Sequence, residues 1–175
     1  MVWGESVYNV AVLEPKSGHV RDRLVKHTGG DALVFTRGEE ISAFSGTYDL
    51  FLVAGGKTEG KTPPLQTKIL LLPDKAPPEI VAGISSGWVV SYGLSGKDSI
   101  TLSSLEPGFA VLTLQRELVT LAETVVEQQE IPLSVPRDLD AQEIMAIYGS
   151  LLVLGEKPET LRAGFSSPLS GRMGP

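Results

Sequence analysis

The chain has no cysteine and only two histidines among its 175 residues. The lack of cysteine excludes disulfides, zinc–thiolate sites and thiol catalysis. Two histidines are too few for a typical transition-metal cluster, so no metal-binding role is expected from this composition. A reducing compartment is the environment in which a chain without disulfides is expected to work.

Long apolar runs and basic clusters are also missing. No stretch approaches the roughly 20 apolar residues of a membrane span, and the start MVWGESVYNV lacks the basic and apolar regions of a secretory signal. The net charge is −6, and no block of Lys or Arg is present to attract a polyanion. These absences predict a cytoplasmic protein whose partners include neither a membrane nor a nucleic acid.

The first half of the chain alternates strand and helix patterns. Five segments are typical of strands: SVYNVAVLE, DALVFT, YDLFLVAG, KILLLPD and GWVVSYGL. Short helices are expected between them at SGHVRDRLVKH and PPEIVAGI, with a brief one in RGEEISAF. Several of the strands are near-continuous apolar runs, as in sheets covered on both faces. The alternation predicts a mostly parallel sheet with right-handed crossovers, a Rossmann-like three-layer α/β sandwich.

From Ser99 the pattern changes to a period of two. Three segments predict an antiparallel β-meander: SITLSSLE, GFAVLTLQREL and TVVEQQEIPLSV. C-terminal helices follow at DAQEIMAIYGSLLVLG and KPETLRAGF, the first with a capping-box spacing at Asp140 and Glu143 and an end at Gly155. Its residues Ile144, Tyr148 and Leu151 are expected along one side. We expect a single domain over residues 1–165 and a flexible tail over residues 166–175.

The second half also carries ordered landmarks of a known family. They are ILLLPDKAPPEI, the strand WVVSYGL with Tyr92 and Gly93, the meander, the long helix ending at Gly155, the short helix, and the pair Gly171 and Arg172. Over residues 69–172 the chain resembles the later part of the central, ATP-binding domain of the Mur ligases. These ATP-dependent enzymes add amino acids to the peptidoglycan precursor. The resemblance implies a bacterial source and a nucleotide-binding type of fold.

Departures from the family pattern limit what the resemblance implies. The family's phosphate loop, Gly-Thr-Asn-Gly-Lys-Thr, would lie at LEPKSGHV, which has no Gly-Lys-Thr and carries Glu14 where an anion would sit. A carboxylate at that point would repel a triphosphate. The family's His-Asn pair and following Asn fall near Leu139, Asp140 and Glu143, which a capping box explains. No segment matches the family's other two domains, so ligation by this chain alone is not expected.

A second segment has the sequence of a phosphate loop in another place. Gly55, Gly60, Lys61 and Thr62 fit G-x-x-x-x-G-K-T, with Gly56 beside them. In a working loop, Lys61 would face the β- and γ-phosphates, Thr62 would bind magnesium, and Asp74 would be the metal's further partner. The pattern requires a following helix, and the connection to the strand at KILLLPD is too short for one. A glycine-rich surface loop that binds at most a small anion is the favoured interpretation.

These observations leave three hypotheses of different class. The favoured one is a non-catalytic, Mur-ligase-like domain with an assembly, regulatory or ligand-binding role, without a cofactor. The first alternative is a nucleotide-binding protein or hydrolase that holds ATP and magnesium at residues 55–62. The second is a Rossmann-like module for a small ligand. The phosphate or anion candidates are Gly55, Gly56, Gly60, Lys61, Thr62 and Arg172, no catalytic residue is assigned, and the expected partner is a protein or a small anion.

Overall fold

A computed structural model describes residues 6–30 and 32–163 of the chain. Its strands are β1 (Tyr8–Leu13), β2 (Leu33–Gly38), β3 (Gly46–Val53), β4 (Leu65–Pro73), β5 (Ile84–Tyr92), β6 (Ile100–Glu106), β7 (Phe109–Leu114), β8 (Leu118–Val119), β9 (Val125–Val126) and β10 (Gln129–Ser134). Its helices are α1 (Val20–Thr28), the 3₁₀ turn η1 (Ile41–Ala43), α2 (Pro78–Gly83), α3 (Ala141–Leu154) and α4 (Pro158–Ala163). The tail expected to be flexible, residues 166–175, lies outside the described residues.

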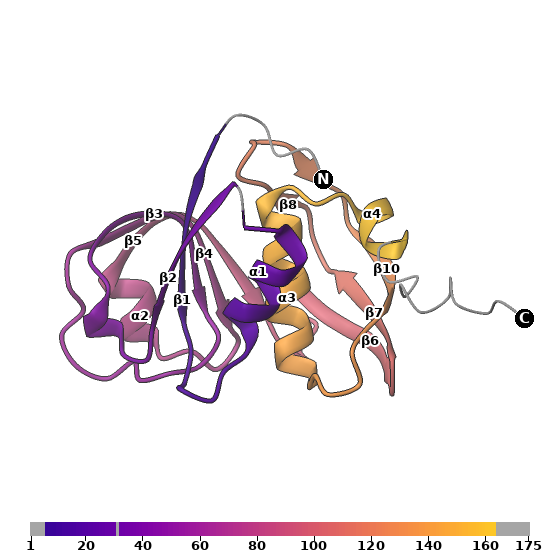
Figure 1. The fold of residues 1–175 in the computed structure, drawn as a ribbon, viewed down its shortest axis with the longest axis horizontal. Helices are drawn as coiled ribbons and strands as arrows, with labels where there is room; N and C mark the ends of the chain where they lie inside the picture. The colour runs from indigo at the N-terminus through magenta and orange to yellow at the C-terminus, as the bar shows by residue number, and fades with distance from the viewer. Residues whose placement is uncertain (1–5, 31, 164–175) are drawn as a thin grey trace, which may run out of the picture.

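Eight strands form one mixed sheet in the order β10-β7-β6-β5-β4-β3-β1-β2. The neighbours from β2 to β5 are all parallel, which confirms the predicted parallel half. Helices α1 and α3 lie on one side of these strands and α2 on the other (Figure 1). Since β1 connects outward to β2 while β3 starts the series in the opposite direction, the chain reverses its winding between β1 and β3. Such a reversal opens a crevice beyond the carboxyl ends of the two strands.

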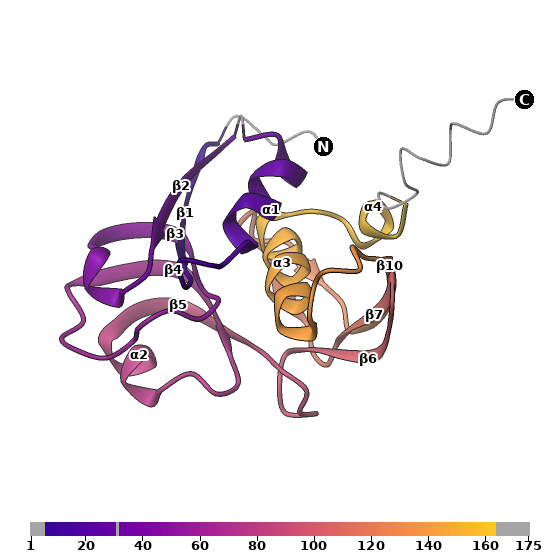
Figure 2. The same ribbon diagram turned by 60° about the horizontal axis from the view of Figure 1, so that its bottom comes forward.

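The other strands form the antiparallel part of the sheet. Strand β6 pairs with β5 at a single position, Tyr92 with Ile100, and then diverges from it. The pairs β6–β7 and β7–β10 are antiparallel, which confirms the meander predicted from Ser99 onward. Figure 2 shows β6, β7 and β10 on the far side of α3 from strands β1 to β5. The sheet therefore wraps around α3.

Helix α3 is the centre of the larger core. Every residue from Ile144 to Leu154 is buried, so the expectation of a single buried side was too narrow. The physical reason is that both parts of the sheet and α1 pack against it, and a helix enclosed in this way is apolar all round. Its predicted ends are confirmed, because Asp140 and Glu143 form a capping box and Gly155 has a φ of 108°. Neither α3 nor any other described helix has the length and apolarity to cross a bilayer.

Two of the predicted strands each divide into two elements, and TVVEQQEIPLSV forms β9 and β10. The segment GFAVLTLQREL ends as a sheet strand at Leu114, and Leu118 and Val119 pair instead with Val125 and Val126. This small hairpin contacts the end of α3, where the Leu121 N–H donates to the Val153 carbonyl at 2.8 Å. The hairpin packs on the last turn of α3 and is separate from the main sheet. The period-two pattern of its residues does not distinguish these two positions.

Candidate active-site crevice

The crevice between β1 and β3 is a cavity of about 210 Å³. The carboxyl ends of both strands, the end of β5 and the amino end of α3 contribute to its lining, with Glu14, Tyr92, Asp140 and Glu143 as the titratable groups. In open α/β sheets, ligands bind at the carboxyl ends of the strands where the winding reverses. This crevice is therefore the candidate site.

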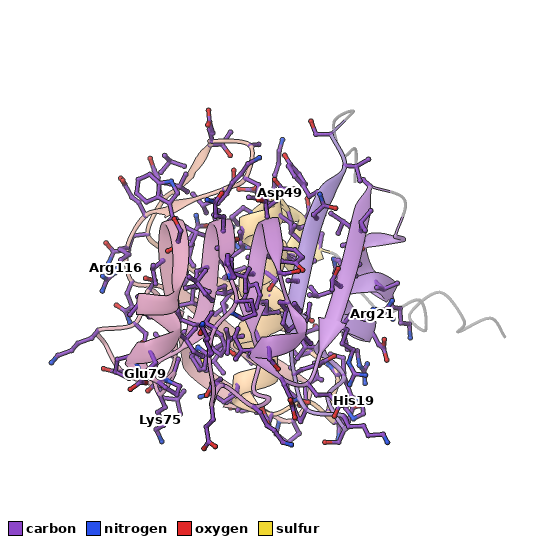
Figure 3. All side chains as sticks on the ribbon, turned by 90° about the vertical axis from the view of Figure 1, so that its left-hand side faces the viewer. His19, Arg21, Asp49, Lys75, Glu79 and Arg116 are labelled. Atoms are coloured by element: carbon purple, nitrogen blue, oxygen red, sulfur yellow. The ribbon has the colours of Figure 1, made fainter. Side chains whose placement is uncertain are left out.

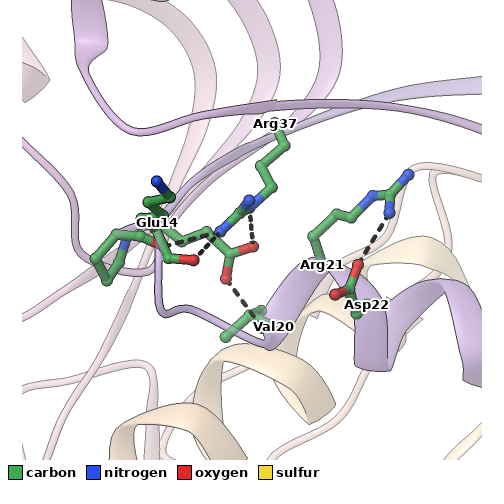
Figure 4. A network of polar contacts seen from close by, with 7 residues as sticks. Glu14, Val20, Arg21, Asp22 and Arg37 are labelled. Carbon is green, nitrogen blue, oxygen red and sulfur yellow. Dashed lines mark hydrogen bonds and ion pairs between the residues drawn. The ribbon is translucent and has the colours of Figure 1, made fainter.

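Glu14, the residue after β1, fills the position at which such sites hold an anion. Its side chain is 1% exposed. One carboxylate oxygen, Oε2, accepts a hydrogen bond of 3.0 Å from the N–H of Val20, the first residue of α1. The other oxygen, Oε1, accepts one of 2.8 Å from Nε of Arg37 on β2 (Figure 4). Since His19 makes no side-chain cap, Glu14 supplies the negative charge that the helix N-terminus favours.

The loop from Glu14 to Gly18 is shaped around this carboxylate. Nη2 of Arg37 donates to the carbonyls of Pro15 at 2.9 Å and Lys16 at 3.0 Å, so one guanidinium holds both the loop and the acid. The N–H of Gly18 donates to the Pro15 carbonyl at 2.7 Å. A Cβ on Gly18 would lie 2.5 Å from Oε2 of Glu14, which is closer than any real contact. Glycine at this position therefore lets the carboxylate reach the helix.

The amino end of α3 adds further carboxylates to the crevice. Asp140 accepts from the Glu143 N–H at 2.8 Å, and Glu143 accepts from the Asp140 N–H at 3.0 Å. Neither lysine nor arginine is among the residues lining the cavity. Glu14 is paired with Arg37, but Asp140 and Glu143 have no cation among the lining residues, so they repel an anionic ligand and attract a cation or a hydrogen-bond donor. The crevice thus has the opposite polarity to a nucleotide site.

Tyr92 closes the crevice at the end of β5. It is buried, and its hydroxyl donates to the Val53 carbonyl at 2.7 Å. Burial, with the nearby carboxylates of Asp140 and Asp74, raises the pKa of the Tyr92 hydroxyl above its ordinary value of 10.0. Tyr92 is therefore a neutral group that joins the ends of β5 and β3.

Residue 93 is a glycine because the space beside its Cα is occupied by two carboxylate side chains. A Cβ on Gly93 would lie 2.6 Å from Cγ of Asp74 and 2.6 Å from Oδ2 of Asp98. Asp98 is itself 4% exposed and accepts from the Ser95 N–H at 3.1 Å. The Tyr-Gly pair thus fits two carboxylates against the strand end, and it adds to the acidic character of this edge.

The glycine-rich loop between β3 and β4 does not gather its phosphate candidates in one place. Gly55 lies at the carboxyl edge, where an added Cβ would be 3.0 Å from Cδ of Pro15. Thr62 lies at the opposite edge, since a Cβ on Gly83, just before β5, would be 2.9 Å from its Cβ. The loop therefore runs back across the sheet, a distance of about 25 Å for an eight-residue strand. A single phosphate group cannot contact both ends.

The remaining phosphate candidates face solvent or fall outside the described residues. Gly56, Gly60 and Lys61 are exposed, and none of residues 54–64 is helical. The lysine with a partner in this loop is Lys57, whose Nζ lies 3.1 Å from the Glu40 carboxylate. Arg172 lies beyond residue 163. Within the described part of the chain, no three His, Asp or Glu side chains are arranged to hold a metal ion.

A larger hollow of about 600 Å³ lies at the amino edge of the sheet. It is lined by the ends of loops near Gly46, Pro64 and Ile84, and none of its lining residues is titratable. It lacks the groups needed for acid–base chemistry or for recognition of a charged ligand. The smaller acidic crevice is therefore the better candidate.

Sequence reasoning found Glu14 but missed Arg37. The position of Glu14 after the first strand followed from the family's loop pattern. Arg37 carried no local signal, because it lies 23 residues away and meets Glu14 only through the parallel pairing of β1 with β2. The pairing of Leu13 with Gly38 brings both residues to the same edge.

No family model matches this chain, and no curated protein matches it either. The function is therefore inferred from the crevice and from the two loops beside it.

Proposed function

We propose that this chain is a non-catalytic, Mur-ligase-like domain of Rossmann-like architecture that binds a ligand or partner and does not use ATP. The observation that carries the proposal is the Glu14 carboxylate bound to the Val20 N–H at the amino end of α1. That position is where a phosphate group rests in nucleotide-binding folds. The Glu14 carboxylate, paired with Arg37, occupies the position that a ligand's phosphate would take.

The architecture supports the Rossmann-like part of the proposal. The strand order β2-β1-β3-β4-β5 has its reversal between β1 and β3, and helices cover both faces of these strands. The antiparallel strands and the buried helix α3 follow in the order expected from the Mur-ligase landmarks. The polarity of the crevice supports the absence of ATP, because a triphosphate there would meet the carboxylates of Asp140 and Glu143 beside Glu14.

Phosphate binding by matched Glu14 variants tests this proposal. Glu14→Ala vacates the anion position and frees Arg37, whereas Glu14→Gln keeps the position filled without the charge. We expect inorganic phosphate to raise the melting temperature of Glu14→Ala and to leave the native chain and Glu14→Gln unchanged. A chain that binds a ligand only when folded is stabilised by it, so thermal unfolding reports occupancy.

Two results would contradict the proposal. A micromolar ATP site saturated with 1 mM Mg-ATP would stabilise the native chain by about 4 kcal/mol, a shift of roughly 10 °C. Such a shift, abolished in Lys61→Ala, would favour nucleotide binding at residues 55–62 instead. Absence of any phosphate effect on a folded Glu14→Ala would show that Glu14 does not occupy an anion site.

A second candidate function, a module for a small cationic ligand, is favoured by the acidic lining of the crevice. The glycine loop had suggested a small anion, but the crevice favours the opposite charge. Short diamines are expected to raise the melting temperature, and dicarboxylates of equal length are not. Asp140→Asn is the control, because asparagine keeps the helix cap and removes one charge. Equal responses to amines and acids, or no change in Asp140→Asn, would argue against this function.

A further inference from the structure

Strand β5 leaves one side of the parallel sheet open. On one side, β5 pairs with β4 from Ile84, opposite Leu65, to Tyr92, opposite Pro73. On the other side, β6 pairs with β5 only at Tyr92. No described strand or isolated bridge pairs with residues 84–91 on that side. Figure 3 looks onto the parallel strands with β5 at their left end. The edge therefore presents a row of unpaired backbone donors and acceptors.

Strand β5 is uncharged and carries two exposed apolar side chains. The strand ISSGWVVSY contains neither a charged residue nor a proline. Trp88 is 58% exposed and Val89 is 47% exposed, and because they are successive residues they lie on opposite faces of the sheet. Val81 and Leu94 flank them, so four of the nine exposed large hydrophobic side chains in the described part of the chain fall within residues 81–94. Trp88 and Val89 lie on β5 itself, whereas Val81 lies on α2 and Leu94 follows the strand.

The other two edges of the sheet, β2 and β10, have features that hinder pairing with a further strand. Strand β2 has one charged residue, Arg37 at its carboxyl end, and its guanidinium is bound to Glu14. Strand β10 carries Pro132 and is held by α4, whose Arg162 bonds to the Gln129 side chain at 3.1 Å and to the Glu130 carbonyl at 3.0 Å. Charges, proline and a covering helix are the means by which proteins prevent edge-to-edge pairing. Strand β5 has none of them.

We propose that β5 pairs with β5 of a second copy of this chain, antiparallel across a two-fold axis, to form a continuous sheet in a homodimer. A neutral strand is self-complementary, because its contact places no like charges together although each chain carries −6. A basic partner would be attracted to the acidic crevice edge and not to this neutral strip. Two paired strands with two sets of these apolar side chains approach the roughly 1,000 Å² of a specific interface.

Matched lysine substitutions on two edge strands test the dimer. Val89 on β5 and Val34 on β2 are exposed valines, at 47% and 53%. In sedimentation of the full chain over about 1–100 µM, we expect the native protein and Val34→Lys to dimerise. Val89→Lys should weaken self-association about a hundredfold, because the interface would bury an unpaired charge.

Hydrogen exchange of the native chain provides a measurement that no variant's folding can compromise. Amides within residues 85–91 are expected to gain protection as the protein concentration rises, while those of β2 remain unchanged. A native chain that stays monomeric over this range would overturn the proposal, as would a dimer equally stable in Val89→Lys. These outcomes are independent of the phosphate and ATP experiments, since the interface does not involve the crevice.

Discussion

Two loops that begin at the carboxyl edge of the sheet each have one of the two features of a phosphate loop. The loop from Glu14 to His19 has the position, between the first strand and a helix, but its anion is its own glutamate. The loop from Ala54 to Pro64 has the sequence G-x-x-x-x-G-K-T but leads directly into a strand. The two loops show that the sequence motif is not sufficient for a phosphate site. Phosphates also need a helix N-terminus and converging N–H groups.

Removal of Glu14 is the change with the largest expected effect. Glu14→Ala should lower the free energy of unfolding by about 3 kcal/mol, near the low end for breaking a buried ion pair, because Arg37 keeps water contact. Denaturant unfolding measures this loss. The matched change in the second loop, Glu59→Ala at an exposed position, should stay within about 0.5 kcal/mol. Equal losses would mean that Glu14 is not the anchor of its loop.

A smaller loss is expected when the first loop is crowded. Gly18→Ala places a Cβ against the Glu14 carboxylate, and overpacking of this kind costs about 1–3 kcal/mol. The double variant Glu14→Ala, Gly18→Ala should show that the two losses are not additive, since the clash disappears with the carboxylate. Additive losses in denaturant melts would place the cause of the Gly18 effect elsewhere.

Tyr92 joins the base of the second loop to β5. Tyr92→Phe should lower stability by about 0.5–1.5 kcal/mol at neutral pH, because the hydrogen bond to the Val53 carbonyl is lost. Burial raises the pKa of both Tyr92 and Tyr148 in the folded state, so the folded chain binds these protons more tightly than the unfolded one. The native chain is therefore expected to lose stability as the pH rises above 10.0, the ordinary tyrosine value. Unfolding measured from neutral pH to above 10.0 should show that the stability of Tyr92→Phe declines less with pH than that of the native chain.

The smallest effect is expected in the loop that matches the motif. Lys61 is exposed, so Lys61→Ala should change the free energy of unfolding by no more than about 0.5 kcal/mol. Lys57→Ala is the useful comparison within the same loop, because Lys57 makes an exposed ion pair with Glu40, and such pairs contribute about 1 kcal/mol or less. A Lys61 variant markedly less stable than the Lys57 variant would show a contact that the structure does not contain.

Local sequence predicted most of the elements near the crevice. The Asp140–Glu143 capping box, the end of α3 at Gly155 and the missing helix after Thr62 depend on residues a few positions apart, and all three are confirmed. The Arg37 partner of Glu14 was not predictable in this way. Neither was the enclosure of α3 on all sides, because it depends on strands that return from distant parts of the chain.

The sequence by itself determined the order of most strands and helices, where the parallel half gives way to the meander, and that no helix follows the glycine motif. The observed starts of most of these elements differ from the predicted ones by up to three residues. Periodicity, caps and connection lengths act over a few residues, so they can be seen in the chain alone. Only the tertiary structure decided that Glu14 meets Arg37 at a helix end, that Gly55 and Thr62 lie at opposite edges, and that β5 is left open. These outcomes depend on which strands become neighbours, and strand order is set by packing across the whole sheet.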